Sequence, residues 1–257
     1  MGYALVTGAS KGIGKAIAEE LASRKINLLI VARSQDLLQQ VAKKISENYD
    51  VQVDYLATDL SNPNAAQMVF DWCNKKNYAV DILVNNAGYG LSGLFEKYTA
   101  DENTNMMHVN MLTPVLLCQF FLPMLKQQKK AYILNIASSA AYQAVPYLSV
   151  YAASKAFILS YSRGLRHELK KTNVSVTAIS PGSTDTDFVV RAQIGEKGLQ
   201  TAKKVNMTAH AVAKIAVKSM FARKAEVITG FINKLGAFMV WLMPKELVEK
   251  TAMKIYE

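Results

Sequence analysis

The sequence predicts an α/β protein built on one doubly wound parallel sheet with helices on both faces. Short apolar runs alternate with longer amphipathic stretches along most of the 257 residues, and a glycine-rich turn follows the first apolar run. With 51% hydrophobic residues, the chain can fill one large core. Repeated strand–helix–strand units imply right-handed crossovers, so all strands of the sheet run parallel.

The strands are predicted where the apolar runs are rich in Val, Ile and Leu and almost free of charge. They are Tyr3–Thr7, Asn27–Ala32, Val51–Ala57, Val80–Val84, Ala131–Ile136, Val174–Ile179 and a seventh around Glu226–Thr229. The helical patterns between them are Ile13–Arg24, Gln35–Asn48, Asn64–Lys75, Glu102–Lys126 and Ala153–Lys170.

No linker, repeat or low-complexity stretch divides the chain, which predicts one domain over residues 1–230 with an apolar helical extension over 231–257. We expect no signal peptide, because Met1 leads directly into a strand-like segment. The longest uncharged run near the C-terminus, Leu235–Pro244, is about half a membrane span, so no spanning segment is expected. Cys73 and Cys118 lack disulfide or metal-binding spacing, which favours a reducing, cytoplasmic location.

The net charge of +10 raises the question of polyanionic partners. The basic residues are spread over several predicted helices without a nucleic-acid-binding motif, so we interpret them as a solvated surface and expect no nucleic-acid partner. The three histidines have no metal-ligand spacing with cysteines or acids, and no metal site is predicted. Neither a G-x-S-x-G elbow nor a Walker A lysine occurs.

The turn after the first strand has the residues of a phosphate-binding loop. Gly8, Gly12 and Gly14 follow the strand and open a helix. Glycines let the backbone turn tightly and approach a pyrophosphate, and the helix N-terminus offers unpaired N–H groups. The alternative is a glycine turn with a purely structural role.

The end of the second strand predicts the cofactor. A site that prefers NAD would place a carboxylate about 20 residues beyond the glycines, but Ala32 and Arg33 stand there and the first acid is Asp36. A guanidinium suits a ribose 2′-phosphate, and Lys11 adds a second cation. We therefore predict NADP(H). Alternatively, Arg33 is a solvated charge at a strand end.

Two segments predict the catalytic chemistry. Tyr151 and Lys155 lie four residues apart on one helix face, where an ammonium lowers the phenol pKa and lets the tyrosine exchange a proton with a carbonyl or alcohol oxygen. Ser138, at the end of the fifth strand, can donate to the same oxygen; alternatively, Ser138 and Ser139 only cap a turn.

Two further turns lie at the same edge of the sheet. Asp59 follows the third strand, where it can accept from an adenine amino group or belong to the N-terminal cap of the next helix. Residues Asn85-Asn86-Ala87-Gly88 follow the fourth strand, and their small side chains permit close approach of a ligand.

Together these residues resemble the short-chain dehydrogenase/reductase family over about residues 3–230. The resemblance is carried by Thr7-Gly8-x-x-x-Gly12-x-Gly14, Asn85-Asn86-Ala87-Gly88, Asn110, Ser138, Tyr151-x-x-x-Lys155 and Pro181-Gly182, in the family's order. It implies a three-layer Rossmann sheet of seven strands, a nicotinamide cofactor and a Ser-Tyr-Lys-Asn catalytic set.

The resemblance also implies a role for each position. Tyr151 would be the general acid/base, Ser138 would polarise the carbonyl, Lys155 would bind the nicotinamide ribose and lower the tyrosine pKa, and Asn110 would hold a water linking Lys155 to solvent. The implied cofactor contacts are Gly8, Ser10, Lys11, Gly12, Ile13, Gly14, Arg33, Ser34, Asp59, Leu60, Asn86, Ala87, Gly88, Tyr151, Lys155, Pro181, Gly182, Thr184 and Thr186.

The predicted function is that of an NADP(H)-dependent oxidoreductase interconverting a carbonyl and a secondary alcohol. The alternative is a non-catalytic NADP(H)-binding or sensor protein on the same fold. The resemblance is nearest to a branch with 17β-hydroxysteroid dehydrogenases and 3-oxoacyl reductases. Uncharged Ala141–Tyr147, and a lid over Asp185–Asn206 carrying Phe188, Val189, Val190, Ile194 and Leu199, favour an apolar substrate; alternatively, these side chains only close the core.

Two surfaces are expected to meet partners. The family resemblance implies a homodimer or homotetramer formed through helices Thr104–Lys126 and Ala152–Lys170, with Ala152, Ala153, Ala156, Phe157 and Ser160 allowing close approach. In residues 231–257 an apolar helix precedes Pro244 and a charged amphipathic helix. We favour packing of this tail over the substrate mouth or on a second subunit. The alternative is peripheral contact with an anionic membrane.

Overall fold

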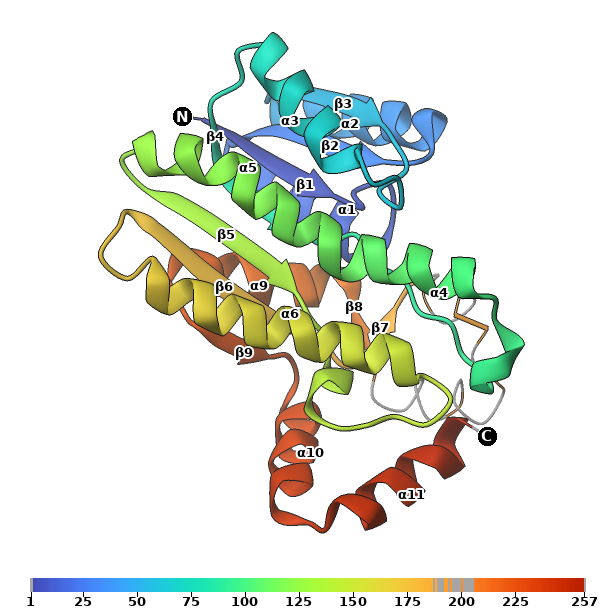
Figure 1. Ribbon diagram of the computed structural model, residues 1–257. Coiled ribbons are helices and arrows are strands. Elements are labelled where there is room, and N and C mark those ends of the chain that lie inside the picture. The colour runs from blue at the N-terminus through green and yellow to red at the C-terminus, as the bar shows by residue number, and fades with distance from the viewer. Residues whose placement is uncertain are drawn as a thin grey trace.

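The computed structural model describes residues 2–186, 188, 192, 193, 195, 200 and 206–256. A central sheet lies between two layers of helices (Figure 1). Its strands are β1 (Tyr3–Thr7), β2 (Asn27–Ala32), β3 (Val53–Ala57), β4 (Val80–Asn85), β5 (Ala131–Ile136), β6 (Val174–Ser180) and β9 (Glu226–Ile228). All seven are parallel, in the order β3-β2-β1-β4-β5-β6-β9, which confirms the predicted doubly wound sheet. The order reverses between β1 and β4, where such sheets bind ligands.

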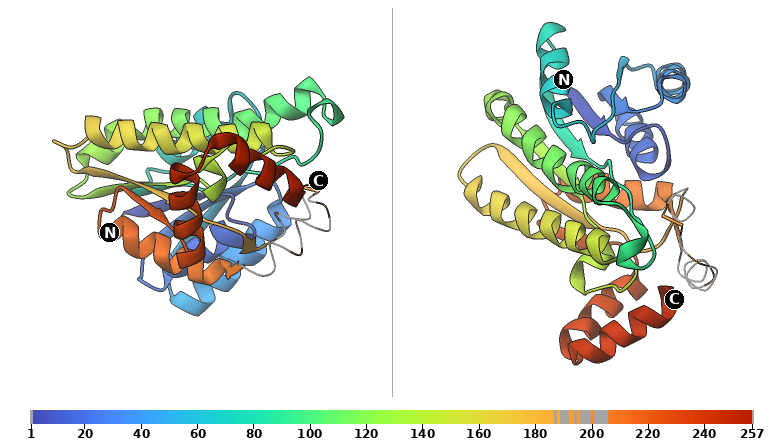
Figure 2. Two further views of the ribbon diagram at one scale, coloured as in Figure 1. Left: turned by 90° about the horizontal axis from the view of Figure 1, so that it is seen from below. Right: turned by 45° about the vertical axis from the view of Figure 1, so that its right-hand side comes forward.

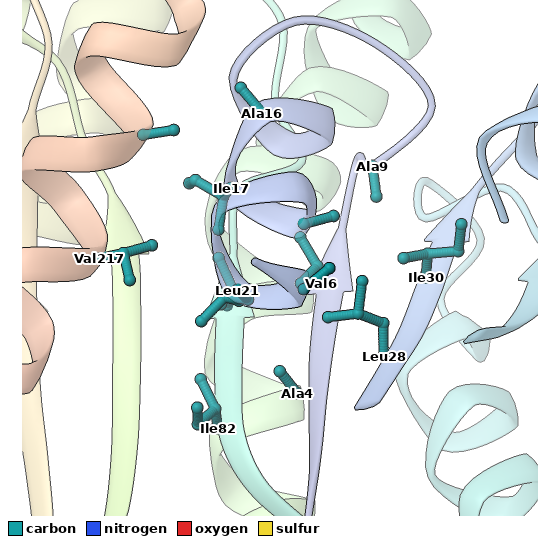
Figure 3. Packing of buried hydrophobic residues seen from close by; sticks show 14 of the residues in the cluster. Ala4, Val6, Ala9, Ala16, Ile17, Leu21, Leu28, Ile30, Ile82 and Val217 are labelled. Carbon is teal, nitrogen blue, oxygen red and sulfur yellow. The ribbon is translucent and has the colours of Figure 1, made fainter. Parts of the chain in front are cut away.

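One face of the sheet is covered by α1 (Gly12–Ala22), α2 (Gln35–Tyr49) and α9 (Ala209–Phe221). Figure 3 shows Ile17 and Leu21 of α1 beside Val6 of β1, and Val217 of α9 alongside, in one buried cluster. The sequence analysis did not predict α9, although its buried residues follow a helical spacing: Val212, Ala213, Ala216, Val217 and Met220.

The other face is covered by α3 (Ala65–Lys75), α5 (Thr113–Gln127) and α6 (Ser149–Glu168). The predicted helix Glu102–Lys126 is observed as α4 (Ala100–Met107), a π-helical turn over His108–Leu112, and α5. This stretch is long and apolar enough to cross a membrane, but Leu117, Phe121 and Leu125 are buried in the core of this face. Its apolar character is therefore accounted for by packing.

The remaining elements lie at the carboxyl edge of the sheet and beyond it. Two short 3₁₀ turns, η1 (Phe95–Lys97) and η3 (Ser139–Tyr142), and the two-stranded pair β7 (Thr184–Asp185) and β8 (Met207–Thr208) were not predicted. The tail forms α10 (Phe231–Leu242) and α11 (Lys245–Tyr256), separated by Pro244 as expected. Figure 2 shows these two helices together at one end of the molecule.

Candidate active site

A cavity of about 1150 Å³ opens at the carboxyl ends of the strands around the switch point. It is lined by every predicted cofactor residue and by the catalytic candidates Ser138, Tyr151 and Lys155. Of the predicted site residues, all of which lie in the described part of the chain, Asn110 alone does not line it. The fold thus brings predicted residues from seven separate segments to one site.

One end of the cavity, the nucleotide end, is lined by the glycine loop and is formed mainly by main-chain atoms. Gly8 and Gly12 have φ angles of +66° and +54°, a region that side-chain-bearing residues rarely adopt. A Cβ atom at Gly8 would lie 2.8 Å from the Ala87 Cα, and one at Gly14 would overlap the Gly8 carbonyl oxygen and the Asn86 side chain. Helix α1 starts without a side-chain cap, so its first N–H groups face the cavity end, as a phosphate site requires.

Asn86 fastens this loop to the next turn. Its Nδ2 donates to the Thr7 carbonyl oxygen at 2.9 Å and to that of Gly8 at 3.3 Å. The backbone N–H groups of Asn86 and Ala87 both donate to Thr7 Oγ1, at 3.0 and 3.1 Å. The side chain of Asn86, which the family resemblance implies as a cofactor contact, therefore also holds the ends of β1 and β4 together.

At the end of β2, Arg33 and Ser34 line the adenosine side of the cavity. Arg33 is exposed, and its guanidinium makes no hydrogen bond or ion pair within the described residues. Asp59 also lines the cavity, and its Oδ1 accepts from Ser61 N at 3.0 Å and Ser61 Oγ at 2.9 Å. Asp59 thus stabilises a local turn, while the N-terminal cap of α3 is Asn64.

The other end of the cavity, the catalytic end, holds the catalytic candidates and is formed by buried side chains. Tyr151 and Lys155 lie on the inner face of α6, 8% and 5% exposed, with Lys155 Nζ 5.8 Å from the centre of the Tyr151 ring. Lys155 Nζ donates to the Ile136 carbonyl oxygen at 3.0 Å. Burial without a compensating carboxylate lowers the pKa of Lys155 to about 8.

Ser138 is placed for both functions that the sequence left open. It caps η3, because its Oγ accepts from the Ala140 N–H at 3.1 Å, and it lines the cavity. Its hydroxyl hydrogen has no acceptor among the residues that the structure describes, so it can be donated to a ligand oxygen.

Asn110 lies behind the cavity in the π-helical turn, 1% exposed. Its Oδ1 accepts from Tyr89 N at 3.0 Å, and its Nδ2 donates to the Tyr89 carbonyl oxygen at 2.9 Å and to Ser154 Oγ at 3.0 Å. Ser154 Oγ in turn donates to the Tyr151 carbonyl oxygen at 2.7 Å. Asn110 thereby links the loop after Gly88 to the turn of α6 that carries Tyr151.

Sequence reasoning missed a buried polar ladder below this end. Asn85 Nδ2 donates to Asn135 Oδ1 at 2.9 Å, and Asn135 Nδ2 donates to Ser162 Oγ at 2.8 Å. The ladder ties β4, β5 and α6 together beneath the site. The signal in the sequence was an asparagine near the end of two otherwise apolar strands.

The predicted substrate side is only partly observed. The Phe188 ring lies 5.2 Å from that of Tyr151 and lines the cavity, whereas Val189, Val190, Ile194 and Leu199 lie outside the described residues. No residue of Ala141–Tyr147 lines the cavity. Val145 from that segment is instead buried beside Tyr151, in a cluster that includes Ala252 of α11.

The sequence model described as short chain dehydrogenase matches residues 2–197. The chain belongs to the short-chain dehydrogenase/reductase family. It is 34% identical over 205 residues to an uncharacterized oxidoreductase of Staphylococcus saprophyticus, covering 77% of this chain and 88% of that protein. It is 33% identical over 197 residues to hydroxysteroid dehydrogenase-like protein 1 of Gallus gallus, covering 76% of this chain but only 59% of that protein's length.

Solved structures of the family share the fold. A short-chain dehydrogenase from Sphingobium yanoikuyae in complex with NADPH has a TM-score of 0.82 and 29% identity, covering 95% of each chain. Another from Burkholderia phymatum, in complex with NAD, has a TM-score of 0.84 and 22% identity, covering 94% of this chain and 93% of that one. The fold binds nicotinamide cofactors, and both NADPH and NAD complexes occur among its neighbours.

Proposed function

We propose that this short-chain dehydrogenase/reductase is an NADP(H)-dependent enzyme that interconverts a carbonyl and a secondary alcohol. The observation that carries the proposal is the convergence of Ser138, Tyr151 and Lys155 on the cavity that the glycine loop also lines. Each of the three supplies a function that carbonyl reduction needs: a hydrogen-bond donor, a proton donor and a cation.

The residues act on one oxygen atom. The cofactor, when bound, supplies or accepts the hydride. Tyr151 gives its proton to the carbonyl oxygen during reduction and removes it from the alcohol during oxidation. The Ser138 hydroxyl donates to the same oxygen, and the ammonium of Lys155, 5.8 Å from the tyrosine ring, stabilises the phenolate electrostatically.

Replacing the proposed acid/base tests this function. In an NADPH-oxidation screen across 3-oxoacyl thioesters, steroids and small ketones, Tyr151→Phe should lower kcat/KM by about 10²–10⁴-fold with cofactor binding retained. Tyr161→Phe, on the same helix but outside the cavity lining, is the control. Full activity of Tyr151→Phe would show that the assigned mechanism is wrong. NADPH binding without turnover of any compound would instead favour the non-catalytic alternative.

The preference for NADP(H) rests on Arg33 and Lys11 at the adenosine end. Among the described residues that line the cavity, Asp59 is the one acidic residue. Charge-assisted contacts contribute about 1.5–3 kcal/mol each, so two of them correspond to a preference for NADPH over NADH of about 10²-fold or more. Arg33→Asp should abolish or reverse this preference in titrations, while Lys44→Asp on exposed α2 leaves it intact. Equal dissociation constants in the wild type would contradict the assignment.

The proposed substrate is apolar, such as a 3-oxoacyl chain, a steroid-like ring system or an aromatic ketone. Phe188 and Leu148 line the cavity and pack in one cluster with Tyr151. The name of one relative, a hydroxysteroid dehydrogenase-like protein, agrees with this class.

We also propose a homo-oligomer formed through the outer faces of α5 and α6. Ala153, Phe157 and Ser160 are exposed on one stripe of α6, and the Phe157 ring stacks on Tyr161 at 6.2 Å. Ala152 was predicted to belong to this face, but it is 3% exposed and packs within its own chain. Light scattering at micromolar concentration should show a dimer or tetramer.

A cytoplasmic location agrees with the buried free thiols of Cys73 and Cys118.

A further inference from the structure

Helix α10 reaches into the cavity through one side chain. Among the described residues of the tail, Asn233 alone lines the cavity. A Cβ atom at Gly182 would overlap the side-chain amide of Asn233, so this amide packs directly on the Pro181–Gly182 turn at the end of β6. Asn233 belongs to none of the sequence motifs. Its place in the cavity depends on how the tail packs against the end of the sheet, which the sequence does not show locally.

The amide of Asn233 has a fixed orientation. Its Nδ2 donates to the Thr229 carbonyl oxygen at 2.8 Å, and a Cβ at Gly230 would lie 3.1 Å from the same nitrogen. Its Oδ1 accepts no hydrogen bond from the residues that the structure describes. The side chain therefore presents a neutral acceptor at the catalytic end of the cavity.

We propose that Asn233 is a positioning residue whose Oδ1 accepts a hydrogen bond from the carboxamide NH₂ of the bound nicotinamide. This rests on the proposed function. A carbonyl substrate has no donor at its reacting group, whereas the cofactor has one in its carboxamide, and Asn233 packs on Gly182, one of the implied cofactor contacts that line the cavity. Thr186 lines the same cavity, but its hydroxyl is already used within the chain. Its Oγ1 accepts from the Phe188 N–H at 3.3 Å and donates to the Thr184 carbonyl oxygen at 3.4 Å.

The contact couples cofactor binding to the tail. Helix α10 has no buried residue, and the buried contact of the described tail is Ala252 of α11, which packs beside Tyr151. A hydrogen bond from the nicotinamide carboxamide to Asn233 Oδ1 adds an attachment point on α10. Bound NADPH should therefore protect the backbone amides of α10 from hydrogen exchange, whereas 2′,5′-ADP, which lacks the nicotinamide, should not.

The test compares cofactor affinities in full-length protein. Asn233→Ala should raise the Kd for NADPH by about 10-fold and leave the Kd for 2′,5′-ADP unchanged. In the wild type, the analogue of NADPH with an acetyl group in place of the carboxamide should bind about 10-fold more weakly than NADPH, and Asn233→Ala should not weaken it further. Ile232→Ala, an exposed neighbour outside the cavity lining, is the control.

The outcomes separate this proposal from the proposed function. Equal losses for NADPH and 2′,5′-ADP would assign Asn233 a merely structural role and overturn the inference, as would an unchanged Kd for NADPH. If the wild type binds NADH rather than NADPH, the preference for NADP(H) fails, and the comparison runs with NADH, its acetyl analogue and 5′-ADP. If no nicotinamide cofactor binds, both proposals fail.

Discussion

The two ends of the cavity are built in different ways. At the nucleotide end, backbone packs on backbone, with Gly8 and Gly14 in positions where a Cβ would meet Ala87, Gly8 or Asn86. At the catalytic end, side chains from α6, β5 and α10 converge, and a buried lysine lies beside a tyrosine. The nucleotide end needs particular residues at fixed spacing, so it can be recognised in a sequence. The second depends on where distant elements pack.

The largest effect on folding should come from the backbone-built end. Gly14→Ala places a Cβ against backbone that cannot move freely, which should lower the free energy of unfolding by about 1–3 kcal/mol and weaken NADPH binding. Gly164→Ala is the matched control, because a Cβ at Gly164 in α6 meets nothing within 4 Å and should raise stability by about 0.5–1 kcal/mol. Chemical denaturation measures both; equal shifts in the two variants would remove the distinction between the ends.

The same contrast explains what the sequence predicted. The bounds of β1, β2 and β5 are those expected from apolar runs, because parallel strands buried on both faces carry a continuous hydrophobic signal. The glycine loop was predicted from spacing alone. Ala152 was assigned to the wrong surface, and Val145 was expected near the substrate, because neither the inner face of α6 nor the course of the loop before it is encoded locally.

Other site features depended on tertiary packing in the same way. Asn86 lines the cavity as implied, but the proximity of β1 and β4 directs its side-chain Nδ2 to two backbone carbonyls, which no local pattern showed. Asn233 carries no motif, and its place in the cavity follows from the return of the chain after β9. A local pattern fixes what a backbone can do, while a side chain's partner is fixed by the assembled fold.

The catalytic end should show a pH-dependent stability. Burial lowers the pKa of Lys155 to about 8, whereas an unfolded lysine titrates near 10.4. Between these values the unfolded chain binds more protons, so stability should rise with pH from about 8 to 10, by at most about 1.4 kcal/mol per pH unit. Lys155→Met removes this contribution but keeps the chain's other titrating groups.

The measurement is the difference in unfolding free energy between wild-type and Lys155→Met protein, both free of cofactor, across this pH range. The difference should shift in favour of the wild type as the pH rises. Tyrosines buried elsewhere lower the free energy of unfolding of both proteins at high pH, so their contributions cancel in the difference. Parallel stability curves would indicate that Lys155 is solvated in the folded protein and that burial does not lower its pKa.

The tail contains the same contrast within a single helix. On α10, Asn233 faces the cavity, while Phe238 and Trp241 stack on each other at 6.3 Å with 54% and 78% of their surfaces exposed. By comparison, Phe121 on α5, which is also rich in apolar residues, is fully buried. Apolar composition alone therefore did not reveal which helix belongs to the core. An exposed apolar face of this kind is typical of an interaction surface.

The smallest effect should come from this outer face. Trp241→Ser removes a side chain with little contact in its own chain, so in dilute protein the free energy of unfolding should change by less than about 0.5 kcal/mol and the Kd for NADPH should stay the same. Unfolding at several protein concentrations tests this. A wild-type midpoint that rises with concentration, and no longer does so in Trp241→Ser, would show that a second copy covers the face. Co-sedimentation of the wild type with anionic vesicles, lost in Trp241→Ser, would instead indicate contact with a membrane, because an indole at the bilayer interface contributes to such binding. Either result would mean that the outer face of α10, like the inner one, acquires its role only from a partner outside the helix.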